Sequence, residues 1–495
     1  MHDNWLETNF ASLYLEQLLK ESILACGRTA PNPTVAALAF DSTNPDLWAS
    51  GATEPPGGRH AEIVALDRFQ DRYSSAPDSL VVTLEPCSKT GRTPPCVDRI
   101  RSIPELQTIY IGGLDPGLSG EGVHLLEHGG RKVYLPATLG TFSGNESSDS
   151  DDLQSQHSHR RAAERRLPGL SSFLSGLRRL YGLFPASFAH RIQYGRPRLI
   201  LKAASDASGI MGDKEQRVTI SGAGALHTGQ LLRRVADAVL VGPGTVLTDE
   251  PGLDWRPAAQ VLPIGVTRNL LLSKEGSGNA SPHSLSNSDT RGTSQSEKPP
   301  ASAPVNSATA QDRQSEKLPI SLPHYLRSAD PFLEALLRYG DEKEMLTTEF
   351  DHQPRRVFLI PEGKMDPARL KAFQERQWER FQTGGPEPVF WTLSKKNKPG
   401  DLPSLKDPSF GSSLMQALAE LGLNTVLVEG GAGLHGALQA ILQPDDRFYW
   451  LRSKSSLQSQ EFQKPVELPR YLTKLPELQL MDLGPDELIA FAGRA

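Results

Sequence analysis

The segment SLVVTLEPCSKTGRTPPC, which runs from Ser79 to Cys96, decides how the first part of this 495-residue chain folds. Its opening run of apolar residues, 79–84, predicts a buried strand, and the stretch 95–103 predicts a helix soon after it. Strands that alternate with helices are typical of a layered α/β fold with crossover connections. The segment also places Cys87 just past the end of the predicted strand.

The same alternation continues on both sides of this segment. Leucine and isoleucine recur at helical spacing between Leu13 and Leu24, and apolar runs such as RLILKA at 198–203 predict strands. A further short apolar run covers 34–40, helices are expected at 60–69 and 173–183, and strands are expected at 107–112, 236–241, 356–360, 388–392 and 425–428. Two α/β domains are the simplest account of these two series.

Two stretches are too polar to pack into a core. The residues 141–159 are rich in serine and acid, and 273–318 contains eleven serines and no aromatic residue. Such segments cannot bury enough apolar surface to offset the entropy of ordering them. The sequence therefore predicts a first domain at 1–140, a linker at 141–164, and a second domain at 165–495 with a disordered insertion at 273–318.

Composition limits the partners and the compartment. The chain has 53 basic and 58 acidic side chains, and this net charge of −5 excludes a generic polyanion-binding protein, so we expect no nucleic-acid partner. Three cysteines are too few for a secreted disulfide scaffold. The N-terminus carries no leader pattern, and no apolar run is long enough to cross a membrane. We expect a soluble, cytoplasmic protein without a membrane partner.

One group of residues has the composition of a metal centre. His60 and Glu62 open a predicted helix, and Cys87 and Cys96 follow later in the chain. One imidazole and two thiolates can hold zinc with the fourth position open, as catalytic zinc requires. Glu62 would then handle a proton beside the metal without binding it. Each residue alone has an ordinary alternative, a hydrogen-bonded histidine or a buried small thiol, but the joint pattern favours the metal site.

The pattern of His-x-Glu followed by Pro-Cys is the signature of zinc deaminases, whose second cysteine follows after two residues. Here eight residues intervene between the cysteines. This longer gap, together with the segments Pro31–Val35 and Gly120–Gly122, closely resembles the deaminase domain of the bifunctional riboflavin-biosynthesis deaminase/reductase family. The resemblance implies a cytidine-deaminase-like αβα domain at the N-terminus. Lys89-Thr90 departs from the family, which commonly has histidine or an aromatic residue there.

The resemblance also implies a role for each matching residue of this domain. His60, Cys87 and Cys96 would hold zinc, and Glu62 would be the catalytic proton carrier. Asn32 would contact the edge of the pyrimidine, and Arg92 would meet the substrate phosphate, which suits a forked guanidinium.

The second half resembles the family's reductase domain, which is similar in fold to dihydrofolate reductase. The matching segments, in chain order, are Leu201-Lys202, Gln230–Arg233, Thr245–Leu253 and the glycine-rich turn after Glu429. Carried over position by position, the residues lining NADPH would be Ala204, Thr245, Asp249, Gly431, Ala432, Gly433, Leu434, His435, Gly436 and Ala437. Those holding the phosphorylated substrate would be Arg233, Leu253, Arg256 and Glu429.

In this family a diaminohydroxy-phosphoribosylamino-pyrimidine loses an amino group by hydrolysis, and NADPH then reduces the ribose of the product to ribityl. The resemblance implies both activities, with Zn²⁺ and NADPH as cofactors and a small phosphorylated pyrimidine as substrate. One alternative is a zinc deaminase for another base, with an unrelated C-terminal domain. Another is a deaminase whose reductase-like domain is degenerate and serves binding or oligomerisation. The oligomeric state stays open.

Overall fold

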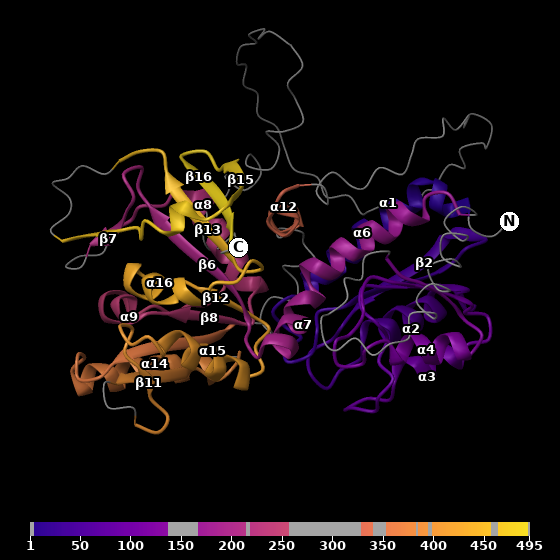
Figure 1. Ribbon diagram of the computed structural model, residues 1–495, viewed down its shortest axis with the longest axis horizontal. Helices are drawn as coiled ribbons and strands as arrows, with labels where there is room; N and C mark the ends of the chain where they lie inside the picture. The colour runs from indigo at the N-terminus through magenta and orange to yellow at the C-terminus, as the bar shows by residue number, and fades with distance from the viewer. Residues whose placement is uncertain are drawn as a thin grey trace, which may run out of the picture.

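The computed structural model describes residues 4–136, 167–213, 218–256, 328–339, 353–382, 385–394, 398–456 and 464–493 (Figure 1). The linker predicted at 141–164 and the insertion predicted at 273–318 lie outside the described residues. Within those ranges, the chain forms two layered α/β parts that lie beside each other in Figure 1. No helix in the described ranges combines the length and apolar character needed to cross a bilayer.

The first part is built on one mixed sheet with the strand order β2-β1-β3-β4-β5. Its strands are β1 (Ala36–Asp41), β2 (Asn44–Ala52), β3 (Ser79–Val82), β4 (Thr108–Ile111) and β5 (Lys132–Tyr134). Strand β1 runs antiparallel to both its neighbours, while β3, β4 and β5 are parallel. The apolar run predicted at 79–84 is confirmed as a strand, and it is buried on both faces because helices cover both.

Helices cover the two faces of this sheet. One face packs against α2 (Ala61–Tyr73), α3 (Cys96–Arg101) and α4 (Glu121–His128). The other face packs against α1 (Asn9–Ala25) and α6 (Leu170–Leu183), with the short 3-10 helix η1 (Asn4–Glu7) beside them. The predicted three-layer αβα arrangement is therefore present.

Helix α6 lies beyond the predicted linker in the sequence, yet it packs on the first sheet. Phe173 of this helix meets the rings of Trp5 and Tyr110 edge to face, at centroid distances of 5.0 and 5.8 Å. Such aromatic pairs add to the free energy gained from burying the rings. The predicted domain boundaries stay a prediction, and this packing shows that the residues just after 166 contribute to the first core.

The second part is built on a longer sheet with the order β11-β10-β9-β8-β12-β6-β13-β16-β15. Its strands are β6 (Arg198–Ser205), β8 (Ala238–Val241), β9 (Arg355–Pro361), β10 (Val389–Ser394), β11 (Leu402–Pro403), β12 (Thr425–Val428), β13 (Arg447–Ser453), β15 (Glu477–Asp482) and β16 (Asp486–Ala492). The pairs from β11 to β13 are parallel, and β16 and β15 add an antiparallel end. Strands β7 (Ile210–Asp213) and β14 (Pro465–Glu467) pair separately.

The helices of this part lie between its strands along the chain, except the first, which precedes β6. They are α7 (Pro185–Tyr194), α8 (Ala223–Val235), α9 (Pro243–Asp249), α12 (Pro331–Tyr339), α14 (Pro367–Gln382), α15 (Phe410–Glu420) and α16 (Ala432–Leu438), with the short turns η3 (Gln439–Ile441) and η5 (Leu472–Lys474). The strands predicted in this half are confirmed as β6, β8, β9, β10 and β12. The antiparallel strands β15 and β16 are not among the sequence predictions.

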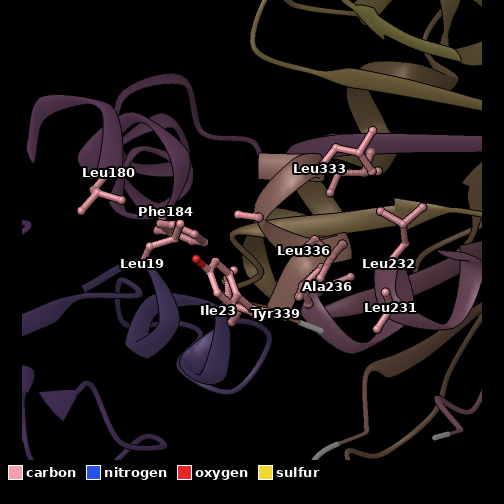
Figure 2. Close-up of a cluster of buried hydrophobic side chains, with 14 of the residues drawn as sticks. Leu19, Ile23, Leu180, Phe184, Leu231, Leu232, Ala236, Leu333, Leu336 and Tyr339 are labelled. Atoms are coloured by element: carbon pink, nitrogen blue, oxygen red, sulfur yellow. The ribbon is translucent and has the colours of Figure 1, made fainter. Parts of the chain in front are cut away.

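Helix α12 joins the two parts through a continuous apolar core. Figure 2 shows its Leu333, Leu336 and Tyr339 between α1, which contributes Leu19 and Ile23, and the leucines of α8. These side chains are almost fully buried. The Tyr339 hydroxyl also donates a 2.7 Å hydrogen bond to Glu16 of α1. The two sheets therefore share one core, so their relative position is fixed by packing.

Truncation of this core tests its contribution to stability. Leu336 is fully buried, so Leu336→Ala should lower the free energy of unfolding by about 3 kcal/mol through lost burial and the cavity left behind. The same substitution at Leu226 of α8, whose residue is 45% exposed, should change it by less than about 0.5 kcal/mol. Urea unfolding of the full chain measures both. Equal effects at the two positions would show that α12 does not contribute to a common core.

Candidate metal centre and cofactor cavity

Three predicted ligands meet at one end of the first sheet. His60 precedes the first turn of α2, Cys87 follows β3, and Cys96 is the first residue of α3. Their donor atoms all lie within 4.8 Å of one another. The Nδ1 atom of His60 is 3.5 Å from the Cys87 sulfur and 3.3 Å from the Cys96 sulfur. One imidazole nitrogen and two sulfurs at this separation form a donor set that suits zinc and leaves room for a further ligand.

The loops that carry the cysteines are held by a buried carboxylate. Glu85, two residues before Cys87, is 3% exposed and accepts hydrogen bonds from the backbone amides of Asp115, Gly120 and Gly122 at 3.1, 3.3 and 2.8 Å. A Cβ atom at Gly122 would lie only 2.2 Å from the carbonyl oxygen of Pro86, so the close approach requires glycine. This network fixes the chain immediately before the metal ligand. No role for Glu85 is predicted from the sequence.

The electrostatics of the cluster favour a thiolate at Cys87. Hydrogen bonds from Cys96 and His60 lower the pKa of the Cys87 thiol well below its usual value, and the backbone amide of Cys96 donates to the same sulfur at 3.2 Å. The pKa of the Cys96 thiol shifts in the opposite direction, because its hydrogen bond to Cys87 and its burial both raise it. The hydrogen bond to Cys87 raises the pKa of His60. A thiolate and an imidazole are the ligand forms that bind a metal cation.

Glu62 lies in the first turn of α2 and is only 4% exposed. Burial raises the pKa of its carboxyl to about 7, and the nearby charge of Cys87 adds to the shift. The carboxyl also shares a hydrogen bond with the Cys96 thiol. A buried carboxyl beside a candidate metal centre can hold or release a proton at neutral pH. Helix α2 thus presents its first turn toward the cysteines.

The other predicted residues of this domain lie on loops. Asn32 is half-buried in the segment that leads into β1, and its backbone amide donates to Thr29 at 2.8 Å. Arg92 is exposed on the loop between the two cysteines. Neither side chain is among the donor atoms of the cluster.

The second part contains a cavity of about 610 Å³ between β6, the start of α9 and the turn from β12 into α16. Eight residues predicted to line the cofactor or hold the substrate lie on its wall: Ala204, Thr245, Asp249, Glu429, Gly431, Ala432, Gly433 and Leu434. The glycine-rich turn after β12 and the helix after it are confirmed. Gly431 has nothing within 4 Å of the position that a Cβ would take, so the wall is open there.

Arg233 and Glu429, both predicted to hold the substrate, pair with each other. The Nε and Nη2 atoms of Arg233 each donate to a carboxylate oxygen of Glu429 at 2.7 Å, and its Nη1 donates to the carbonyl of Asp254 at 3.1 Å. Burial alone would raise the pKa of Glu429, but the charges of Arg233 and Lys202 lower it to about 2. All three guanidinium nitrogens are thus engaged, and Glu429 is held as a carboxylate on the cavity wall.

The remaining predicted residues are not brought to the cavity wall. Leu253 is 2% exposed and has a left-handed backbone with φ of 58°, while Arg256 is exposed and its amide donates to Gln230. His435 is fully buried and is not on the cavity wall, and burial lowers the pKa of its imidazole to about 4. Gly436 and Ala437 continue α16 beyond the cavity.

Several residues on the wall are not among the residues predicted from the sequence. Lys202 on β6, Met211 on β7 and Val466 on β14 all line the cavity. Lys202 belongs to the motif Leu201-Lys202, so its place near the reductase site could have been predicted from the sequence. Strands β7 and β14 are separated by more than two hundred residues and pair only in three dimensions, so no local pattern could have placed Met211 beside Val466.

The fold and this donor cluster define a two-domain α/β protein with a candidate metal centre in one domain and a candidate cofactor cavity in the other. The same fold occurs over 98% of this chain and 99% of the solved chain of a diaminohydroxyphosphoribosylaminopyrimidine deaminase/5-amino-6-(5-phosphoribosylamino)uracil reductase from Thermotoga maritima, with a TM-score of 0.57 and 20% identity. Acinetobacter baumannii RibD covers the same shares with a TM-score of 0.54 and 17% identity. These likenesses confirm the predicted α/β fold class.

Sequence comparison gives relatives of one kind. The riboflavin biosynthesis protein RibD of Mycobacterium tuberculosis is 31% identical over 244 residues, which is 48% of this chain and 59% of that protein. RibD of Aquifex aeolicus is 29% identical over 261 residues, 51% of this chain and 58% of that protein. The matched region thus spans less than two thirds of these curated relatives. No protein-family model matches the chain. The predicted resemblance to the riboflavin-biosynthesis deaminase/reductase family is confirmed.

The three cysteines allow a controlled test of the metal centre. Cys96→Ser removes one sulfur of the cluster and should abolish stoichiometric metal binding, whereas the purified native chain should carry one metal ion. Cys26 is buried outside the cluster, so Cys26→Ser should retain the ion. Elemental analysis after gel filtration measures the metal content of all three proteins. Loss of the metal from the Cys26 variant, or its absence from the native chain, would contradict the assignment.

Proposed function

We propose that this chain is a bifunctional enzyme of riboflavin biosynthesis. Its first domain would remove an amino group from 2,5-diamino-6-(5-phosphoribosylamino)pyrimidin-4-one by hydrolysis, and its second would use NADPH to reduce the ribosyl group of the product to ribityl. The observation that carries the proposal is the cluster of His60, Cys87 and Cys96 with the buried Glu62 beside it. The similarity to proteins named RibD supports the particular substrate.

The proposed metal is zinc, which matches a donor set of one imidazole and two thiolates. When bound there, zinc would lower the pKa of a water molecule and so make a nucleophile available at neutral pH. The chain itself would supply the metal ligands, the protected environment and the proton carrier. Cys87 is already disposed to be a thiolate, because it receives hydrogen bonds from its neighbours.

Glu62 would move the protons of the deamination. Its carboxylate would accept a proton from the attacking water as the carbon–oxygen bond forms. It would then deliver a proton to the amino nitrogen as the carbon–nitrogen bond breaks, so that ammonia leaves. The elevated pKa of Glu62 suits a group that must both accept and donate a proton near neutral pH.

The second activity would take place in the cavity around Glu429. NADPH, when bound, supplies the hydride, and the protein supplies binding and orientation. The open turn at Gly431 would give room for the cofactor, and Glu429 would present a fixed carboxylate to the substrate. We propose that Arg233 acts by holding Glu429 in place, since its guanidinium is already used for that contact.

Glu62→Gln tests the first activity. The amide keeps the size of the side chain but cannot carry the proton, so ammonia release should fall by about 10³-fold while the metal stays bound. Glu127→Gln, at an exposed position on α4, should leave the rate unchanged. Ammonia release from the phosphoribosylamino-pyrimidine and from free cytidine is measured in parallel. Faster release from cytidine would favour the alternative of a deaminase for another base.

Gly431→Asp tests the second activity without weakening the fold. Gly431 is the N-cap residue of α16 with φ of −75°, and aspartate is favoured at such positions, but its charge would repel the phosphates of NADPH. We expect the Kd for NADPH to rise about tenfold, which corresponds to about 1.4 kcal/mol. Gly431→Asn has nearly the same shape but no charge, so it measures the steric effect alone and should raise the Kd less than the aspartate does. Fluorescence titration measures the affinities.

Equal effects of Asp and Asn at this position would show that the cavity does not hold an anionic cofactor. A chain that deaminates but never oxidises NADPH in the presence of the deaminated product would instead support the alternative of a degenerate reductase domain.

A further inference from the structure

The two domains are linked by hydrogen bonds at the backbone of Asn32. The Nδ2 atom of Asn424, in the second domain, donates to the carbonyl oxygen of Asn32 at 2.9 Å. Arg191 of α7 donates through Nη2 to the carbonyl of Pro31 at 2.8 Å and through Nε to Oδ1 of Asn424 at 2.8 Å. These three bonds form one connected network around a single loop of the first domain.

The orientation of the Asn424 amide is determined by its partners. A guanidinium can only donate, so the atom of Asn424 that faces Arg191 must be the oxygen. The nitrogen then faces the carbonyl of Asn32, which can only accept. Both halves of the amide are satisfied, and Asn424 itself is 3% exposed, so its two hydrogen bonds are partly buried, while the bond from Arg191 to Pro31 lies at the surface.

The backbone around Asn424 is rigid. The amides of Asn424 and Thr425 both donate to one carboxylate oxygen of Asp237 at 2.8 Å, and the carbonyl of Asn424 accepts from the amide of Arg198 at 2.9 Å. Asn424 directly precedes β12, which is paired on both sides by parallel strands. The donor that holds Asn32 is therefore attached to the centre of the second sheet.

The loop that contains Asn32 lies at the same end of the first sheet as the metal cluster. Asn32 is four residues before Ala36, whose amide donates to the Thr83 hydroxyl at 3.1 Å at the end of β3 that leads to Cys87. Ala36 is also paired with Ala52 at the end of β2 that leads to His60. The segment that leads to Cys87 and the segment that leads to His60 therefore both start next to the strand that follows Asn32.

The side chain of Asn32 is not needed for this link. Only its backbone carbonyl and amide are engaged, and among the described residues its side-chain amide makes no hydrogen bond. The loop therefore has a fixed backbone and an unused amide that can donate and accept. Such an amide can recognise the edge of a pyrimidine, which offers both donors and acceptors.

We infer that Asn424 and Arg191 are positioning residues for the deamination, and that they hold Asn32 from the neighbouring domain in the orientation that meets the pyrimidine. The inference rests on the proposed function. The deaminase site is then completed by the second domain, and its substrate affinity depends on residues that are far from it in the sequence. The dependence runs through the loop backbone and does not involve the metal ligands.

Asn424→Asp in the full chain tests this inference. The substitution keeps an acceptor for Arg191 but turns a carboxylate oxygen toward the carbonyl of Asn32, so the loop should shift. We expect kcat/KM for deamination to fall by about tenfold to hundredfold, the size of effect that a small misplacement produces, with the metal content unchanged. The matched change Asn44→Asp, at the exposed first residue of β2, should have no effect. Arg191→Met provides a second route if the first variant does not fold.

A double-mutant cycle separates positioning from a general loss of stability. In an Asn32→Ala background, Asn424→Asp should cause no further loss, because both substitutions remove the same contact to substrate. Additive losses, or an unchanged kcat/KM in the single variant, would overturn the inference.

Hydrogen exchange gives a measure that does not depend on the substrate. Amides of 28–35 should exchange faster in the Asn424→Asp variant than in the native chain, and unchanged protection there would also overturn the inference. If the variant exchanges faster at 28–35 but the native chain releases no ammonia from the pyrimidine, the proposed deamination is wrong while the link between the domains stands.

Discussion

The buried apolar contact among α1, α12 and α8 is the constraint on which the arrangement of the molecule depends. It joins the cores of the two sheets, so that the domains meet in one fixed orientation. Hydrogen bonds act over only about 3 Å, and those between Asn424 and Asn32 can persist only while larger surfaces hold the domains in register. The non-directional packing therefore supplies most of the cohesion, and the polar contacts select one alignment.

Much of the first domain could be predicted because its information is local. The predicted ligands His60, Cys87 and Cys96 lie within 37 positions of one another, and the structure brings their donor atoms within 4.8 Å of one another. Other features could not be found in this way. Strand β15 is the outermost strand of its sheet and mixes charged and apolar residues, so its periodicity is weak. Asn32 and Asn424 are 392 positions apart in the sequence, and nothing in either residue type indicates that the two make contact.

The second domain shows where a pattern of residue types stops being informative. The turn at Gly431 was predicted on the cavity wall and lies there, since a strand, a glycine-rich turn and a helix specify their own geometry. Arg233 was expected to face a ligand, but a guanidinium can satisfy a carboxylate of the protein equally well. Here it binds Glu429, and only the three-dimensional neighbours decide between these outcomes. Sequence therefore identified the members of the cavity more reliably than their roles.

The placement of α6 has a consequence for any cleavage of the chain between its two halves. This helix follows the serine-rich stretch in sequence, but its Phe173 packs edge to face against Tyr110 of β4 and Trp5 of η1. A fragment that stopped at residue 136 would expose these rings to solvent and be prone to aggregate. A protease cut between 136 and 167 in the intact protein would leave both fragments associated non-covalently, so the nicked molecule should migrate as one species until a denaturant separates the pieces.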